Sequence, residues 1–132
     1  MVSHNYMCNL ARQVIDGAER QPDELHWNPL PLFHLNATAS TVVASMLLGA
    51  PASIAARFSV PGFWPEIQRT GARIATILGA MLSLIGRMDD TPEMKDCYGQ
   101  LRVVRGSRFL QNCNRFGVSG SASRCPDHNP TG

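Results

Sequence analysis

The sequence predicts an all-α fold: a single compact bundle of four or five helices with proline-rich connectors and a flexible C-terminal tail. Of its 132 residues, 44% are hydrophobic and 17% are charged, which is enough apolar surface for one folded domain. Apolar residues recur at steps of three and four over long stretches, and proline and glycine gather between those stretches. We therefore expect a helical domain over residues 1–111 and a flexible tail over residues 112–132.

The first expected helix covers residues 3–20. Ser3 is a suitable N-cap, because its hydroxyl can accept a hydrogen bond from a backbone N–H of the first turn. The apolar residues follow one helical face, at Met7, Leu10, Ala11, Val14, Ile15 and Ala18. This spacing predicts an amphipathic helix with its charged residues turned outward.

An ordered connector is expected over residues 21–35. Pro22, Pro29 and Pro31 remove backbone donors and disfavour helical geometry in the residues before them, which excludes a regular helix from 28 to 31. Leucine and aromatic residues alternate with these prolines. We expect this segment to pack across the helices.

The second expected helix begins near Asn36 or Thr38 and ends at Leu48. Pro51 either opens a short further helix through Phe58 or kinks one continuous helix. Both alternatives keep residues 36–58 helical.

The third expected helix is the longest and the most buried. A turn at residues 59–62 precedes it, and Pro65 and Glu66 suit its first turn. Its apolar residues continue in steps of three and four to Met88: Ile67, Gly71, Ile74, Leu78, Met81 and Ile85. Further apolar residues widen the stripe, so this helix is expected at the centre of the bundle.

Residues 89–93 are expected to end that helix and to cap another. Helical spacing continues from Met94 to Val104. A hairpin with strands at 101–104 and 108–111 is the alternative, and we prefer the helix. Few apolar residues follow Gln111, which predicts the flexible tail.

The expected compartment is the cytoplasm, because no secretory signal is visible at the N-terminus. The four cysteines should then be reduced. A membrane-associated helical hairpin of residues 37–58 and 65–87 is an alternative. We favour burial of these stretches inside the protein, since small residues, hydroxyls and Pro51 weaken membrane insertion. A membrane is therefore not a favoured partner.

Catalytic motifs are weak. Arg20 and His26 match the spacing of the Arg–His pair that HEPN ribonuclease domains use, in which the imidazole moves a proton and the guanidinium stabilises phosphate charge. This gives an alternative function, a HEPN-like RNA-binding or metal-independent ribonuclease domain. Pro22 interrupts the helix that would hold both side chains, and no other catalytic pattern occurs. The sequence thus favours a protein without catalytic residues or cofactors.

The C-terminal third holds two further candidate sites. Arginines that could contact nucleic-acid phosphates are Arg102, Arg105, Arg108 and Arg115. Metal-ligand candidates are Cys113, Cys125 and His128, although close cysteine pairs are missing. Neither nucleic acid nor a metal is the favoured partner.

Protein–protein contact is the leading functional hypothesis. Aromatic residues that lie in the two proline-rich connectors are candidate contact anchors, namely Trp27, Phe33, Phe58, Phe63 and Trp64. The alternative is that they seal the core. We expect a non-enzymatic helical protein that binds a protein partner, most simply a second copy of itself.

Overall fold

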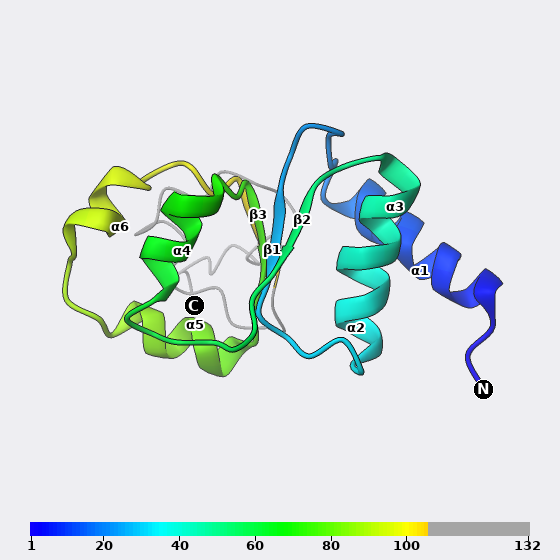
Figure 1. The fold of residues 1–132 in the computed structure, drawn as a ribbon, viewed down its shortest axis with the longest axis horizontal. Helices are drawn as coiled ribbons and strands as arrows, with labels where there is room; N and C mark the ends of the chain where they lie inside the picture. Colours follow the sequence, from blue (N-terminus) through cyan, green and yellow to red (C-terminus); the bar gives the residue numbers. More distant parts are fainter. Residues whose placement is uncertain (106–132) are drawn as a thin grey trace, which may run out of the picture.

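The computed structural model describes residues 1–105 and has an α/β fold, so the predicted all-α bundle is wrong. A parallel sheet lies in the middle of the molecule, with helices on both sides (Figure 1). The strands are β1 (His26–Asn28), β2 (Ala52–Ile54), β3 (Ile74–Thr76) and β4 (Val103–Arg105). The helices are α1 (His4–Gly17), α2 (Leu35–Ala37), the π-helix η1 (Thr38–Val43), α3 (Ala44–Leu48), α4 (Phe63–Thr70), α5 (Gly79–Gly86) and α6 (Pro92–Asp96).

Within residues 1–105 the sheet has four strands in the order β2-β1-β3-β4, and all pairs of neighbours are parallel. His26 lies opposite Ala52 on one side and Ile74 on the other. Ile74 in turn lies opposite Val103. β1 is therefore an inner strand, although it comes first in the chain.

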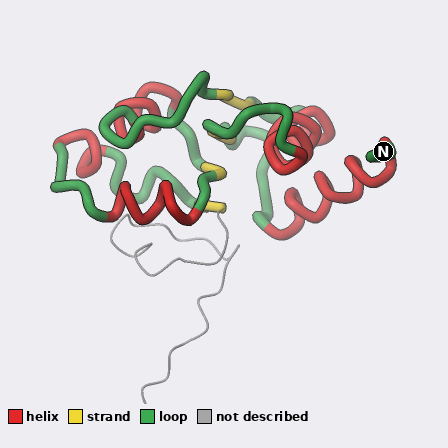
Figure 2. Tube along the Cα trace, turned by 90° about the horizontal axis from the view of Figure 1, so that it is seen from below, coloured by secondary structure: helices red, strands yellow, loops and turns green. Residues whose placement is uncertain are grey.

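Successive residues of each strand point to opposite faces of the sheet. Trp27, Ala75 and Val104 belong to the main core, on the side of α4, α5 and α6. Ile74 and Val103 pack instead with Ala18, just after α1. We call these two sides the α4 face and the α1 face. Figure 2 shows the helices gathered in two groups with the strands between them.

Two predicted helices are confirmed. Ser3 caps α1, and its Oγ accepts a hydrogen bond of 3.2 Å from Tyr6 N. Residues 35–48 form one continuous helical segment in which α2, η1 and α3 follow without a break. It ends at Gly49, whose φ of 67° is the left-handed conformation that glycine adopts readily.

The predicted helix after Pro51 is wrong, because residues 52–54 form strand β2. β2 gains backbone hydrogen bonds by pairing with β1, and Ala55 N extends the contact by donating to Asn28 O at 3.0 Å. A kinked helix could not lie in register beside β1.

The predicted long helix over residues 65–88 is also wrong. α4 ends at Thr70, and Gly71 follows in the left-handed conformation with a φ of 68°. The chain then forms β3 before α5 begins at Gly79. Ile74 and Ala75 are fully buried within the sheet, so their spacing reflects burial on both faces rather than a helical stripe.

The start of α6 is as predicted, with the Thr91 hydroxyl accepting from Met94 N at 3.2 Å. The helix ends at Asp96, so the predicted continuation to Val104 is wrong. Residues 103–105 pair in parallel with β3 instead. Residues 103–105 do form a strand close to the first strand of the alternative hairpin, whereas its second strand, like the predicted tail over 112–132, lies outside the described residues. Within residues 1–105, no helix combines the length and apolar character needed to cross a bilayer.

Candidate functional site

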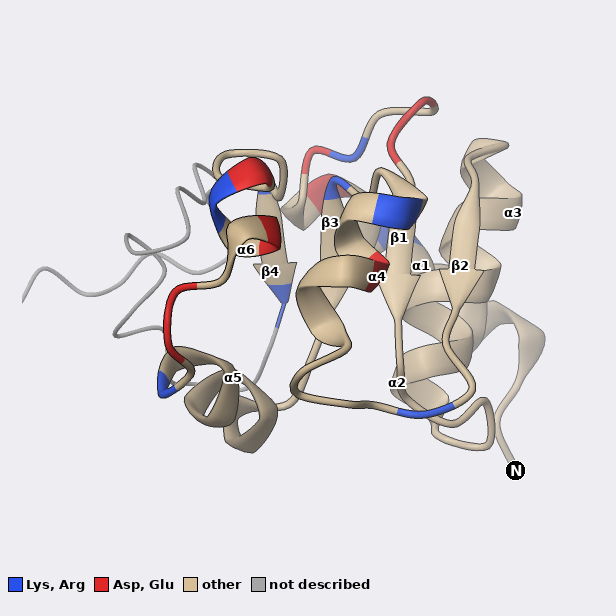
Figure 3. Ribbon diagram, turned by 60° about the vertical axis from the view of Figure 1, so that its left-hand side comes forward, with Lys and Arg blue, Asp and Glu red and all other residues tan. Residues whose placement is uncertain are grey.

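The carboxyl ends of β1 and β3 are the strongest candidate for a binding site. After β1 the chain enters α2 and η1, whereas after β3 it enters α5, whose Leu82 and Ile85 pack in the core of the α4 face. The chain therefore leaves two adjacent parallel strands toward opposite faces. Parallel α/β sheets bind their ligands at such a switch point. Figure 3 shows α2 and α5 at the end of the sheet toward which the strand arrows point.

The loop after β1, residues 29–34, presents apolar side chains at this switch point. Leu32 is 50% exposed and Phe33 is 84% exposed. The rings of Phe33 and His34 lie 4.7 Å apart between centroids. The Thr38 hydroxyl donates to Leu32 O and holds the loop against the following helix. Across the switch point, Leu78 after β3 is 45% exposed.

Beneath this loop, Asn28 joins β1 to η1. Its Nδ2 donates to Thr41 Oγ1 at 2.7 Å, and its Oδ1 accepts from Leu30 N at 2.8 Å. Both Asn28 and Thr41 are completely buried. π-Helical turns such as η1 occur often at functional sites, and here the turn carries the hydroxyl that fixes the end of β1.

A group of buried polar residues continues from Asn28 across the α1 face. We call it the polar layer, and its members are Arg20, His26, Asn28, Ser40, Thr41, Ser45 and Thr76. Burial of this many polar groups is costly unless they are hydrogen-bonded. The polar layer therefore constrains how α1 and the η1–α3 segment can pack on the sheet.

His26 is the centre of the polar layer. Its Nε2 lies 2.7 Å from Thr76 Oγ1 on the neighbouring strand. Burial, together with the charges of Arg20 and Arg105, lowers the pKa of His26 to about 3. The ring is therefore neutral at neutral pH.

Arg20 lies at the amino end of the same layer and is 4% exposed. Its Nη2 donates to Ser45 Oγ at 2.7 Å and to Pro51 O at 3.1 Å. Burial lowers the pKa of Arg20, and Glu24 opposes that change. The side chains of Arg20 and His26 thus have separate hydrogen-bond partners and are almost completely buried, so the arrangement gives no support to the predicted RNA-cleaving pair.

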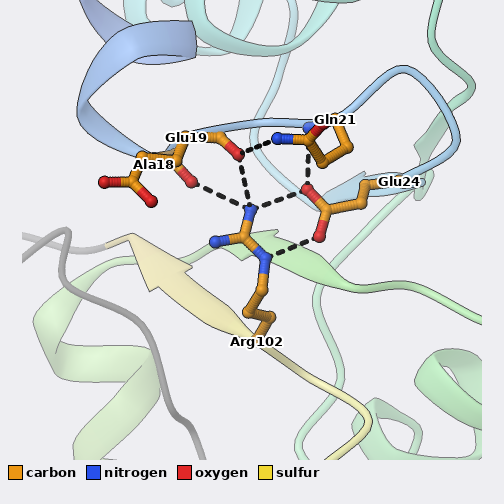
Figure 4. Close-up of polar contacts among 5 residues, drawn as sticks. All are labelled: Ala18, Glu19, Gln21, Glu24 and Arg102. Atoms are coloured by element: carbon orange, nitrogen blue, oxygen red, sulfur yellow. Dashed lines mark hydrogen bonds and ion pairs between the residues drawn. The ribbon is translucent and has the colours of Figure 1, made fainter.

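The guanidinium of Arg102 is bound to a carboxylate of the protein and is not free to contact a phosphate. Its Nε donates to Glu24 Oε1 at 2.5 Å, and its Nη2 donates to Glu24 Oε2 at 2.6 Å and to Ala18 O at 2.9 Å (Figure 4). This contact lowers the pKa of Glu24 and raises that of Arg102. The Arg102–Glu24 ion pair ties the segment before β4 to the segment before β1.

The remaining charged and metal-binding candidates are placed only in part. Arg105 ends β4 and is half-buried, and burial lowers its pKa. The other predicted arginines and metal ligands lie outside the described residues: Arg108, Arg115, Cys113, Cys125 and His128. Among residues 1–105, no three potential metal ligands come together.

The five predicted contact aromatics do not form one surface. Trp27, Phe63 and Trp64 are 1–2% exposed and belong to the core of the α4 face, where the rings of Trp27 and Phe63 meet edge to face at 5.4 Å. Phe58 is partly buried against that core. Only Phe33 of these five is largely exposed, so the other four seal the core, which the sequence also allowed.

Sequence reasoning missed Asn28, Thr41 and Thr76. A usable signal was present for two of them, since Asn28 and Thr76 each end a short run containing buried apolar or aromatic residues and precede a change of direction. Thr41 carried no signal of its own, because one hydroxyl in a helix is common.

Sequence comparison relates the chain to CoA ligases. It is 26% identical over 103 residues to a crotonobetaine/carnitine–CoA ligase of Escherichia coli O45:K1, a match that covers 74% of this chain and 20% of the relative. It is 26% identical over 92 residues to 4-coumarate-CoA ligase 2 of Narcissus pseudonarcissus, covering 66% and 16% of the two chains. The chain thus spans about one-fifth of the length of the curated relatives it matches. No family model matches the chain.

Solved structures of CoA ligases share the fold. A malonyl-CoA ligase bound to methylmalonyl-CoA and AMP superposes with a TM-score of 0.71 at 18% identity, covering 80% of this chain and 23% of the ligase. The O-succinylbenzoate CoA synthetase of Bacillus subtilis gives a TM-score of 0.66 at 20% identity, covering 80% and 22%. These similarities overturn the predicted non-enzymatic, self-associating helical protein. This chain has the α/β fold of a segment of CoA ligases.

Proposed function

We propose that this chain forms the part of an acyl-CoA ligase that binds the carboxylic acid. The observation that carries the proposal is the similarity to CoA ligases in both sequence and fold over most of the chain. In such a ligase the carboxylate attacks the α-phosphorus of ATP and releases pyrophosphate. The thiol of CoA then attacks the acyl carbon, loses its proton and releases AMP.

The switch point favours an acid with an apolar acyl group. Leu32, Phe33 and Leu78 give an exposed apolar surface on both sides of it. Burying one such side chain against a ligand contributes about 1.5–3 kcal/mol. The Asn28–Thr41 hydrogen bond holds the base of the loop against η1.

Octanoate titrated into the 15N-labelled chain tests the proposal. We expect the largest amide chemical-shift changes at residues 28–34 and 76–79, with saturation. Replacement of the exposed ring, Phe33→Ala, should weaken binding about tenfold, which is the loss of roughly 1.4 kcal/mol of apolar contact.

Tyr98→Ala is the matched control. Tyr98 is also an exposed aromatic residue, at 63%, but it follows α6 and precedes the amino end of β4. This variant should bind octanoate as the parent does. The proposal fails if octanoate shifts no residue at the switch point, or if both variants weaken binding equally.

A further inference from the structure

The polar layer carries positive charge that its described neighbours do not neutralise. Arg20 is 4% exposed, and its Nε and Nη1 are buried without a hydrogen-bond partner among residues 1–105. Its two hydrogen bonds go to a neutral hydroxyl and a neutral carbonyl, on Ser45 and Pro51. A buried guanidinium without a compensating charge costs several kcal/mol.

The nearest acidic group is already occupied. Both carboxylate oxygens of Glu24 accept from Arg102, and Oε2 also accepts from Gln21 N at 3.0 Å. Glu24 acts on Arg20 through space, but no hydrogen bond joins the two within the described chain. The Glu24 charge is therefore shared with a second arginine, and a positive charge is left over.

Two further buried nitrogen atoms lack a partner within the described chain. The Nδ1 of His26, which is 0% exposed, has no hydrogen-bond partner in residues 1–105, and the same holds for the buried Nη1 of Arg105. His26 N and Arg20 Nη2 both donate to Pro51 O, which places the backbone of His26 beside the guanidinium. Arg20 Nε and Nη1 are thus buried donors without an acceptor within residues 1–105.

We propose that the polar layer binds a small inorganic anion, of the size and charge of chloride, against the guanidinium of Arg20. The anion accepts hydrogen bonds from Arg20 Nε and Nη1 and neutralises the buried charge. Near-complete burial of Arg20 and His26 excludes a bulky organic anion. This site lies at the amino end of β1, away from the switch point. The anion proposal can therefore be refuted without affecting the proposal of acid binding.

Thermal unfolding at constant ionic strength tests the site, with chloride replacing gluconate stepwise. We expect the melting temperature to rise with the logarithm of the chloride concentration above the dissociation constant, by about 5 °C at a tenfold excess. Arg20→Gln keeps a donor for Ser45 but removes the charge, and it should abolish the chloride dependence. Arg12→Gln, at an exposed position on α1, should retain it.

A crystal grown in bromide gives a second test of the anion site, and this test needs no variant. We expect an anomalous peak within hydrogen-bond distance of Arg20 Nε or Nη1. The proposal is overturned if water alone fills this position, or if bromide occurs only at the surface as an adventitious ion. It is equally overturned if chloride and gluconate give the same melting temperature, or if Arg20→Gln keeps the chloride dependence.

Discussion

Acidification from pH 7 to pH 5 will destabilise the protein, because His26 cannot accept a proton where it lies. The pKa of His26 falls from 6.5 to about 3 on folding, mainly through burial. Below pH 6.5 the unfolded chain therefore binds one proton more than the folded chain. The free energy of unfolding must then decrease as the pH falls, until the folded pKa is reached.

The magnitude follows from the two pKa values. One bound proton gives a slope of about 1.4 kcal/mol per pH unit between them. From pH 7 to pH 5 the loss is about 2 kcal/mol, since His26 in the unfolded chain is already partly protonated near its pKa. Glu24, whose pKa is lowered, loses its own stabilisation only as the pH falls below about 4.5. The window above pH 5 thus isolates His26.

Urea unfolding followed by tryptophan fluorescence measures this slope, because Trp27 and Trp64 are buried in the core. The buffers should be zwitterionic with gluconate as counter-ion, since an anion near Arg20 would offset part of the effect. His26→Gln removes the titrating group and should flatten the profile. His34→Gln, at an exposed position, should leave it steep. A parent profile that changes by less than about 0.5 kcal/mol, or an equally steep His26→Gln profile, would refute the reasoning.

Four further substitutions have defined effects on the free energy of unfolding. Arg102→Gln breaks the ion pair with the nearly buried Glu24 and should cost about 2–3 kcal/mol at pH 7, measured by urea unfolding. Glu19 has a φ of 47°, so Glu19→Gly should stabilise by about 0.5–1 kcal/mol, whereas Gly71→Ala, at a φ of 68°, should destabilise by about 1 kcal/mol. Ile67→Ala empties a site that is 0% exposed and should cost about 2–5 kcal/mol.

Each of these expectations has a clear contrary result. Full stability of Arg102→Gln would mean that the ion pair only balances its desolvation. Glu19→Gly and Gly71→Ala must change stability in opposite directions, because no atom lies within 4 Å of a Cβ at Gly71 and backbone strain alone decides. A loss below about 1 kcal/mol for Ile67→Ala would show that the core collapses into the vacated space.

The sequence predicts the helices of this fold better than its strands. The start of α1 at Ser3 and the end of the second helix before Gly49 follow from capping chemistry that acts over a few residues. Each strand has only three residues, which is too short for an alternating pattern. The inner strands are also buried on both faces, as β1 and β3 show, so alternation would not occur even in longer ones.

The break between α4 and β3 shows where the helical spacing of apolar residues led to a wrong prediction. Ile67, Ile74 and Leu78 keep helical steps by coincidence, but Gly71 between them takes the left-handed conformation that ends a helix. Three of the four residues at 74–77 are β-branched, which was an available signal for a strand. The polar layer could not be predicted from the sequence for a different reason. Its partners His26 and Thr76 are separated by 50 positions, and local patterns do not link residues so far apart.

The place of β1 has a consequence for synthesis on the ribosome. Both neighbours of β1 are made after it, and its contact with β3 needs residues up to Thr76. The aromatic and polar side chains of β1 must therefore stay uncovered while roughly fifty further residues emerge, which takes a few seconds. A chaperone that shields nascent apolar segments would bind this strand during that interval. A stalled chain that ends before β3 would stay bound to the chaperone.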